Sequence, residues 1–232
     1  MPYRRTPQVQ ARLDAQRAAI LDAAAELLAE RGYAGCSVAA VAERAGIATG
    51  TVYKHFPGKA ELVVELFRGV VGHEVEAVTA AGELPGDPAE RVVAVFETFA
   101  VRALKAPRRA FALLAEPVDP PIEAERIVFR RKFRDVAAKH IRDGIGQGLL
   151  PPQDAMLTAA GLVGAATELL VGPLTTDTAP IATNPTAVTA YPPGVGRLAV
   201  ERSRPTFGRI GNSGAVSELR TFILRALGGS NA

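Results

Sequence analysis

The segment "VAERAGIATGTVYKHFPGKAEL", residues 41–62, predicts a helix, a sharp turn, a second short helix, a Pro-Gly break and the start of a further helix. Gly46 ends the first of these helices, because glycine readily adopts the left-handed conformation that a tight turn between helices needs. The short helix, residues 49–55, contains no acid and presents hydroxyls, an amine and an imidazole. A helix N-terminus already offers free backbone N–H groups and the positive end of the helix dipole. The segment therefore predicts a surface for an anion that accepts hydrogen bonds.

Two helices precede the short one. Residues 13–31 place apolar side chains at three- and four-residue steps, which predicts an amphipathic helix that Gly32 ends. Ser37 has the side chain of a helix N-cap, and the helix after it repeats small apolar residues at helical spacing. Ala42 and Ala45 of this second helix are small, so it and the short helix can approach closely.

Helical patterns continue along most of the remaining chain, and no strand pattern competes with them. The predicted segments are a helix from Gly58 to about Ala80, one opening at Asp87-Pro88, a short one over residues 107–115, a long one over 122–147, one over 153–171 and a last one over 215–227. Residues 172–214 are rich in Pro, Thr, Gly and Ala and predict an irregular insertion. The sequence thus predicts an all-α fold of about nine helices, with an N-terminal three-helix domain at 1–67 and a helical domain at 68–232.

The distribution of charge matches this division. The first 60 residues carry eight Lys or Arg and five acids, so they hold the whole formal net charge of +3 of the 232-residue chain. Basic charge on a small N-terminal unit suits an anionic partner. Cys36 is the only cysteine, which excludes an internal disulfide and fits a cytoplasmic protein; we interpret it as a buried small residue, with a redox sensor as the alternative.

Two kinds of site are not expected. The three histidines lie far apart and lack metal-ligand spacing, so we predict no metal and no cofactor. The apolar stretch 155–174 is interrupted by Glu168 and is weakly hydrophobic, so we interpret it as a packing helix and expect no membrane partner.

The outward residues of the short helix predict the partner. Val52 and Phe56 face the small core, which leaves a polar set outside: Thr49, Gly50, Thr51, Tyr53, Lys54 and His55. Hydroxyls, an ammonium and an imidazole can contact phosphate oxygens and base edges in a major groove. Lys59 adds a cation at the start of the next helix. The predicted partner is double-stranded DNA.

Residues 20–67, "ILDAAAELLAERGYAGCSVAAVAERAGIATGTVYKHFPGKAELVVELF", resemble the DNA-binding domain of the tetracycline-repressor (TetR) family of bacterial transcription regulators. The resemblance rests on the Gly before an aromatic residue at the end of the first helix, on Ser37, on the "AG" turn and on "GTVYKHF" followed by a Lys. It implies an all-helical homodimer that binds operator DNA and whose second domain binds a small molecule. We interpret the chain as a repressor released from a palindromic operator by an effector, with an activator as the alternative.

The resemblance also assigns roles to single residues. Tyr53, His55 and Lys59 match positions that grip phosphates, and Ser37 matches a capping position that also touches the backbone. Thr49 and Lys54 match variable positions that contact bases, whereas Gly50 and Thr51 match the close-approach pair. Ala48 departs from the usual Ser or Thr that opens the recognition helix, and this predicts that the cap shifts to Thr49.

The second domain contains no catalytic template, so we expect no enzyme activity. Its aromatic and aliphatic residues are candidates for the walls of an effector cavity, with plain core as the alternative: Phe96, Phe99, Phe111, Leu114, Phe129 and Phe133. The basic run at residues 130–142 is interpreted as a solvated face, with Arg130 or Arg134 anchoring an acidic effector as the alternative. The last two helices predict the dimer interface through small and apolar residues: Gly161, Gly164, Leu169, Phe222 and Ile223.

Two other classes of protein remain open at this point. A helical enzyme would need a titratable cluster that the sequence does not show. A helical adaptor, using its basic N-terminus on a membrane or an acidic protein, would show no salt-dependent binding to a specific duplex.

Overall fold

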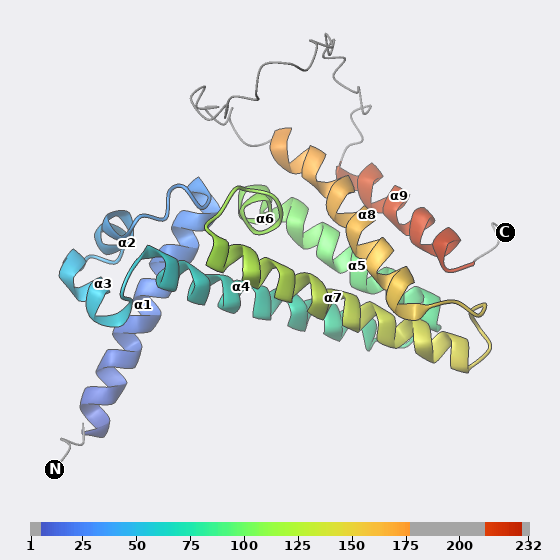
Figure 1. The fold of residues 1–232 in the computed structure, drawn as a ribbon, viewed down its shortest axis with the longest axis horizontal. Helices are drawn as coiled ribbons and strands as arrows, with labels where there is room; N and C mark the ends of the chain where they lie inside the picture. The colour runs from blue at the N-terminus through green and yellow to red at the C-terminus, as the bar shows by residue number, and fades with distance from the viewer. Residues whose placement is uncertain (1–5, 177–211, 229–232) are drawn as a thin grey trace, which may run out of the picture.

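The computed structural model describes residues 6–176 and 212–228, and this part of the chain is entirely helical (Figure 1). The helices are α1 (Pro7–Arg31), α2 (Val38–Arg44), α3 (Thr49–His55), α4 (Lys59–Gly82), α5 (Pro88–Lys105), α6 (Pro107–Leu114), α7 (Pro120–Gly146), α8 (Ala155–Thr176) and α9 (Asn212–Ala226). The all-α prediction is confirmed. α1, α2 and α3 gather at one end, from which the N-terminal part of α1 projects away (Figure 1).

The three N-terminal helices share a small core with the start of α4. Ile20 and Leu27 of α1, Val41 of α2, Val52 of α3 and Leu62 of α4 are all buried. Both predicted turn glycines adopt positive φ, Gly32 at 71° and Gly46 at 66°. These conformations are strained for other residues, so the two glycines fix the angles at which the helices meet.

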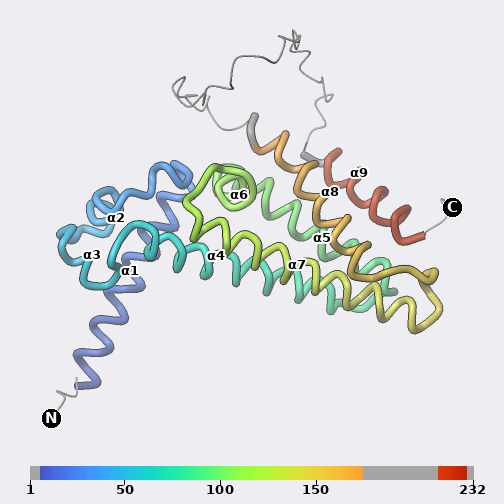
Figure 2. Tube along the Cα trace, viewed as in Figure 1, coloured from blue at the N-terminus to red at the C-terminus, as the bar shows by residue number. Residues whose placement is uncertain are grey.

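The larger helical part is built on three long helices. α4, α5 and α7 pack against one another, and Figure 2 shows α4 and α7 side by side along the length of the molecule. Asp87 caps α5 as predicted, since its carboxylate accepts a hydrogen bond from the backbone N–H of Glu90 at 3.0 Å. The aromatic core lies between α5 and α7, where the Phe96 and Phe133 rings meet edge to face with centroids 5.1 Å apart.

The end of α8 differs from the prediction. The helix continues to Thr176 with Pro173 inside it, whereas the sequence pattern placed its end at Val171. The reason is the buried row at four-residue steps formed by Ala166, Leu170 and Leu174, which extends the apolar face beyond the Gly-Pro pair. α9 likewise begins at Asn212, so the predicted insertion 172–214 is too long at both ends; its remainder, 177–211, lies outside the described residues.

α9 also has an intrachain docking site that the sequence analysis did not foresee. It packs along α5 and α8, and Leu219, Ile223 and Leu227 are buried there. The 20 residues Ala155–Leu174 of α8 are long and apolar enough to cross a membrane, with a mean hydropathy of 1.6. The same helix packs against α5, α6, α7 and α9 within the described chain, as predicted for a packing helix.

Candidate nucleic-acid interface and effector cavity

The short helix α3 is held from behind and exposed in front. Val52 and Phe56 are almost fully buried, with 0% and 2% of their surface exposed. Thr49, Gly50, Tyr53 and Lys54 are exposed, and Tyr53 keeps 53% of its surface in solvent although it is aromatic. An aromatic side chain left this open, beside an ammonium and a hydroxyl, gives α3 a surface that can contact another molecule.

The cap of α3 corrects one expectation. The N-cap is Ala48, at φ −69° and ψ 142°, and no side chain caps the helix. Thr49 is the first helical residue and does not take over the cap, because its own backbone is already helical. The structure records no hydrogen bond from its hydroxyl among the described residues, so this hydroxyl is available to a ligand.

Two predicted phosphate contacts lie deeper than expected. His55 is half-buried, and its Nε2 lies 3.0 Å from Oε1 of Gln16 in α1. The ammonium of Lys59 lies 3.9 Å from the centre of the Tyr33 ring, a cation–π contact. The first contact joins α3 to α1, and the second joins the start of α4 to the turn between α1 and α2. Ser37 is exposed and caps α2, because its hydroxyl accepts from the N–H of Ala40 at 3.1 Å, and Thr51 is half-buried.

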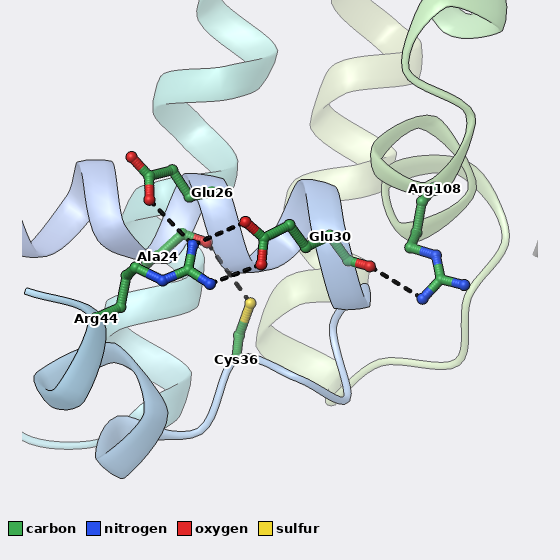
Figure 3. A network of polar contacts seen from close by, with 6 residues as sticks. All are labelled: Ala24, Glu26, Glu30, Cys36, Arg44 and Arg108. Carbon is green, nitrogen blue, oxygen red and sulfur yellow. Dashed lines mark hydrogen bonds and ion pairs between the residues drawn. The ribbon is translucent and has the colours of Figure 1, made fainter.

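Ion pairs hold α2 against α1. The guanidinium of Arg44 donates to Glu26 at 3.0 Å and to Glu30 at 2.9 and 2.6 Å (Figure 3). Figure 3 also shows Arg108 of α6 reaching the end of α1, where it donates to the backbone carbonyl of Glu30 at 3.0 Å. These ion pairs join α2 to α1, and Arg108 attaches α6 directly to α1.

Cys36 is fully buried beneath this network. Its thiol lies 3.7 Å from the carbonyl oxygen of Ala24 and 3.5 Å from that of Gly32, and burial raises its pKa to about 11. A redox sensor needs an exposed thiolate. The geometry thus favours the reading of Cys36 as a small buried residue.

Besides the Arg108–Glu30 contact, a second set of hydrogen bonds connects the N-terminal unit to the segment between α6 and α7. Glu116 accepts from the backbone N–H groups of Tyr33 at 2.8 Å and Ala34 at 3.2 Å, and the Tyr33 hydroxyl donates to Asp119. Burial is the main reason why the pKa of Tyr33 is raised, followed by the Asp119 contact. The sequence analysis did not find these hydrogen bonds, because the partners are more than 80 residues apart.

The candidate effector residues all lie inside the larger helical part, and three of them border a cavity. Phe99, Leu114 and Phe129 line a small cavity of about 20 Å³, whereas Phe96, Phe111 and Phe133 are buried but do not line it. That volume holds about one water molecule. The predicted apolar residues therefore lie together in the interior. The cavity is small, so a larger ligand requires the helices to move apart.

Three charged residues that the sequence analysis missed also line this cavity: Glu74 of α4, Arg102 of α5 and Arg109 of α6. Glu74 is 8% exposed and lies 2.6 Å from Nε of Arg102. No local pattern signals this group, since its members come from three helices.

A wider groove of about 480 Å³ lies between α7 and α8. Arg130, Arg131 and Arg134 line it from α7, and Gly164 and Glu168 from α8. Arg134 already pairs with the adjacent Asp135 at 2.7 Å.

The residues predicted for the dimer interface divide by exposure. Gly161 and Gly164 are exposed, Leu169 is half-buried and Phe222 is 45% exposed, so these four can reach another molecule. Ile223 has no exposed surface and packs within the chain. It therefore cannot contact a partner in this arrangement.

Comparison with known proteins places this arrangement among bacterial regulators. Residues 20–66 match the family model described as bacterial regulatory proteins, tetR family. The chain is 40% identical over 57 residues, 25% of its length, to the fatty acid metabolism regulator protein of Bacillus subtilis (strain 168), and this match spans 29% of that protein. It is 29% identical over 140 residues, 57% of its length, to the HTH-type transcriptional repressor KstR2 of Rhodococcus jostii (strain RHA1), and covers 67% of that protein.

Among solved structures, the fold is similar to that of the transcriptional regulator FadR from Bacillus subtilis in complex with stearoyl-CoA. The TM-score is 0.66 at 18% sequence identity, and the match covers 92% of this chain and 98% of the other. At this identity the likeness establishes the fold.

Proposed function

This chain belongs to the tetR family of bacterial regulatory proteins, and from that premise we propose that it is a repressor that leaves a palindromic operator when a small amphipathic effector binds. The protein acts in the cytoplasm as a homodimer on double-stranded DNA. The observation that carries the proposal is the surface of α3, where Tyr53 and Lys54 are exposed while Val52 and Phe56 on the other side of the helix are buried.

The chemistry of α3 suits a DNA groove. Its exposed side contains donors and no carboxylate, so it does not repel phosphates. Gly50 is exposed and an added Cβ there meets nothing within 4 Å, which leaves room for close approach of a nucleic-acid backbone. In a two-fold dimer the two α3 helices would enter successive major grooves about 34–36 Å apart or somewhat more. Ser37, Thr51, His55 and Lys59 are proposed to contact the backbone from the edges of this surface.

Selection from a random duplex library with the purified full chain tests DNA binding. We expect a palindromic site whose affinity falls steeply with salt, because each phosphate contact releases counterions. Lys54→Ala should change the preferred sequence, whereas Tyr53→Ala should weaken binding to all sequences alike. Lys132→Ala, which removes an exposed lysine of α7, is the matched control and should leave binding unchanged. Failure to select any duplex would contradict the proposed function.

The effector is proposed to be a molecule with a long apolar body and an anionic group, of the kind represented by the stearoyl-CoA bound to the FadR of Bacillus subtilis. The aromatic and aliphatic interior between α4 and α7 supports this class. Stearoyl-CoA should release the operator in a fluorescence-anisotropy titration, whereas coenzyme A alone should not. Retention of the operator at saturating stearoyl-CoA would contradict this effector class.

The outer face of α8 supports the dimer. Leu157 is 72% exposed, and Gly161, Gly164 and Glu168 follow it at helical spacing on the same side of the helix. Small residues let a second helix approach closely, while Leu157 and Phe222 provide apolar area. The face matches what an isologous two-fold contact requires.

A further inference from the structure

The cavity between α4, α5 and α6 has an unusual lining for an apolar interior. Phe99, Leu113, Leu114 and Phe129 form most of its wall together with three alanines, and Glu74 lies among them. A buried carboxylate is costly unless it is paired. Glu74 is paired, since Arg102 contacts it through two nitrogens at 2.6 and 3.1 Å, and Arg109 lies 3.6 Å away.

The two arginines lie nearer to solvent than the carboxylate they hold. Their side chains are 39% and 34% exposed, compared with 10% for the Glu74 side chain. An anion arriving from solvent therefore meets guanidinium groups first. Nη2 of Arg109 lies 3.6 Å from Oε1 of Glu74, which is a weaker contact than that of Arg102. The Arg109 side chain can therefore turn toward a ligand.

We propose that Arg102 and Arg109 are the binding site for the anionic group of the effector, and that Glu74 of α4 is an internal competitor that occupies this site. Arg102 contacts Glu74 through the edge of its guanidinium formed by Nε and Nη2, and only one carboxylate or phosphate can take that edge as a bidentate partner. An effector anion that binds this edge therefore displaces Glu74. The ligand class is a carboxylate or phosphate attached to an apolar chain, whose tail enters between the aromatic residues beside the cavity.

The exchange acts on the helices that carry the DNA-binding surface. α4 loses its ionic contact with α5 when Glu74 is displaced, and α4 begins directly after α3. α6 responds too, because Arg108 beside Arg109 holds the end of α1 through the carbonyl of Glu30. A ligand that favours the displaced arrangement shifts the equilibrium only by its differential affinity for the two states. Competition with Glu74 supplies that difference.

Direct binding measured by calorimetry on the full chain without DNA tests the inference. The probes are laurate, lauroyl-CoA and the neutral 1-dodecanol. Glu74→Gln keeps the shape and removes the competing charge, so it should bind at least one anionic probe about tenfold more tightly, within the usual range of coupling between linked sites. It should bind dodecanol as the unmodified chain does. Which anion gains shows whether the site reads a free carboxylate or an acyl-CoA.

Arg109→Ala provides the opposite change and leaves Glu74 paired with Arg102, so the fold is retained. It should weaken the same anion about tenfold, in keeping with the strength of a charge-assisted contact. Two matched controls should change no affinity. Lys105→Ala removes an exposed cation that does not line the cavity, and Glu83→Gln removes the charge that pairs the C-cap of α4 with Lys139 of α7.

Equal affinities of the unmodified chain and Glu74→Gln for both anions, or no binding of either anion to any variant, would overturn the inference. A gain for dodecanol as large as that for the anions would do so too. The inference rests on the proposed function, but its test contains no DNA. A failure to bind an operator would contradict the proposed function and leave these affinities as they are.

Discussion

At the scale of single residues, His140 of α7 is a buried polar side chain that we expect to destabilise the fold. It is 1% exposed, and neither ring nitrogen has a hydrogen-bond partner among the described residues. The ring lies against α4 and α5: a Cβ added to Gly82 would meet its Nε2 at 2.5 Å and Val95 at 2.8 Å. An unsatisfied buried polar group costs roughly 1–3 kcal/mol.

His140→Leu should therefore raise the free energy of unfolding by about 1 kcal/mol, because an apolar side chain of similar size needs no partner. Chemical denaturation at pH 7.5 measures this value. His73→Leu, at an exposed position of α4, is the control and should stay within about 0.5 kcal/mol of the unmodified chain. A destabilised His140→Leu would show that the ring nitrogens are satisfied.

The same residue predicts a dependence of stability on pH. Burial lowers the pKa of His140 below its ordinary value of 6.5; Lys139 and Arg91 act in the same direction, and Glu83 and Asp143 oppose it. The unfolded chain then binds the proton more tightly than the folded chain, so stability is complete above pH 6.5 and declines as the pH falls below it. The decline should be smaller in His140→Leu when unfolding is followed between pH 7.5 and 5.5.

Residue-level prediction succeeded where the cause is local. Ser37 and Asp87 cap their helices as their side chains and positions indicated, and Gly46 has the positive φ that the turn requires. It failed where the cause is tertiary. Lys59 lies over the ring of Tyr33, which is 26 positions away in the sequence, and no spacing rule brings the two together.

At the scale of the element, α3 has no side-chain cap, unlike α1, α2 and α5. Ala48 already has the extended backbone of an N-cap, so Ala48→Ser needs no rearrangement to offer its hydroxyl to the free N–H groups of α3. We expect the free energy of unfolding to rise by about 0.5–1 kcal/mol, measured by urea denaturation.

The control for this change is Ala19→Ser, the same substitution at an exposed interior position of α1. Serine is a poorer helix former than alanine there, so this variant should lose up to about 0.5 kcal/mol. Equal effects of the two substitutions would contradict the assignment of Ala48 as the N-cap.

Helix positions were largely predictable from the sequence, and their ends less so. The pattern of apolar residues placed α3, α5 and α6 within a residue or two, because caps and prolines mark their ends. α8 ran past its predicted end, since Leu174 has a buried place that a local pattern does not reveal. The Glu74–Arg102–Arg109 group was unpredictable for the same reason, as its members come from three helices.

At the scale of the whole molecule, one continuous helix links the two ends of the proposed mechanism. α4 crosses the predicted domain boundary at residue 67 without a break, starting beside α3 and carrying Glu74 into the larger helical part. The division into domains at 1–67 and 68–232 stays a prediction, because α1 also packs against α4 and α6. In the proposed mechanism this helix transmits a displacement at its middle to the proposed DNA-binding surface.

Under the proposed function two copies bind the operator together, and the α8 face is the proposed contact between them. Leu157→Glu places a charge where a partner helix would pack, and Leu157 is 72% exposed in the chain, so the fold of one copy should not change. Light scattering at micromolar concentration should give twice the 24.3 kDa chain mass for the unmodified protein and the single mass for the variant. Operator affinity should fall with it, because a monomer contacts one half-site.

Leu84→Glu makes the same change at a leucine that is 60% exposed between α4 and α5, away from α8. This control should remain dimeric and bind the operator normally. If Leu157→Glu stayed dimeric, the two α3 helices would have to be related through another surface, and the spacing of the half-sites would have to follow that surface. Because two-fold symmetry in the protein imposes two-fold symmetry on the DNA site, the mass and the operator sequence check the same geometry independently.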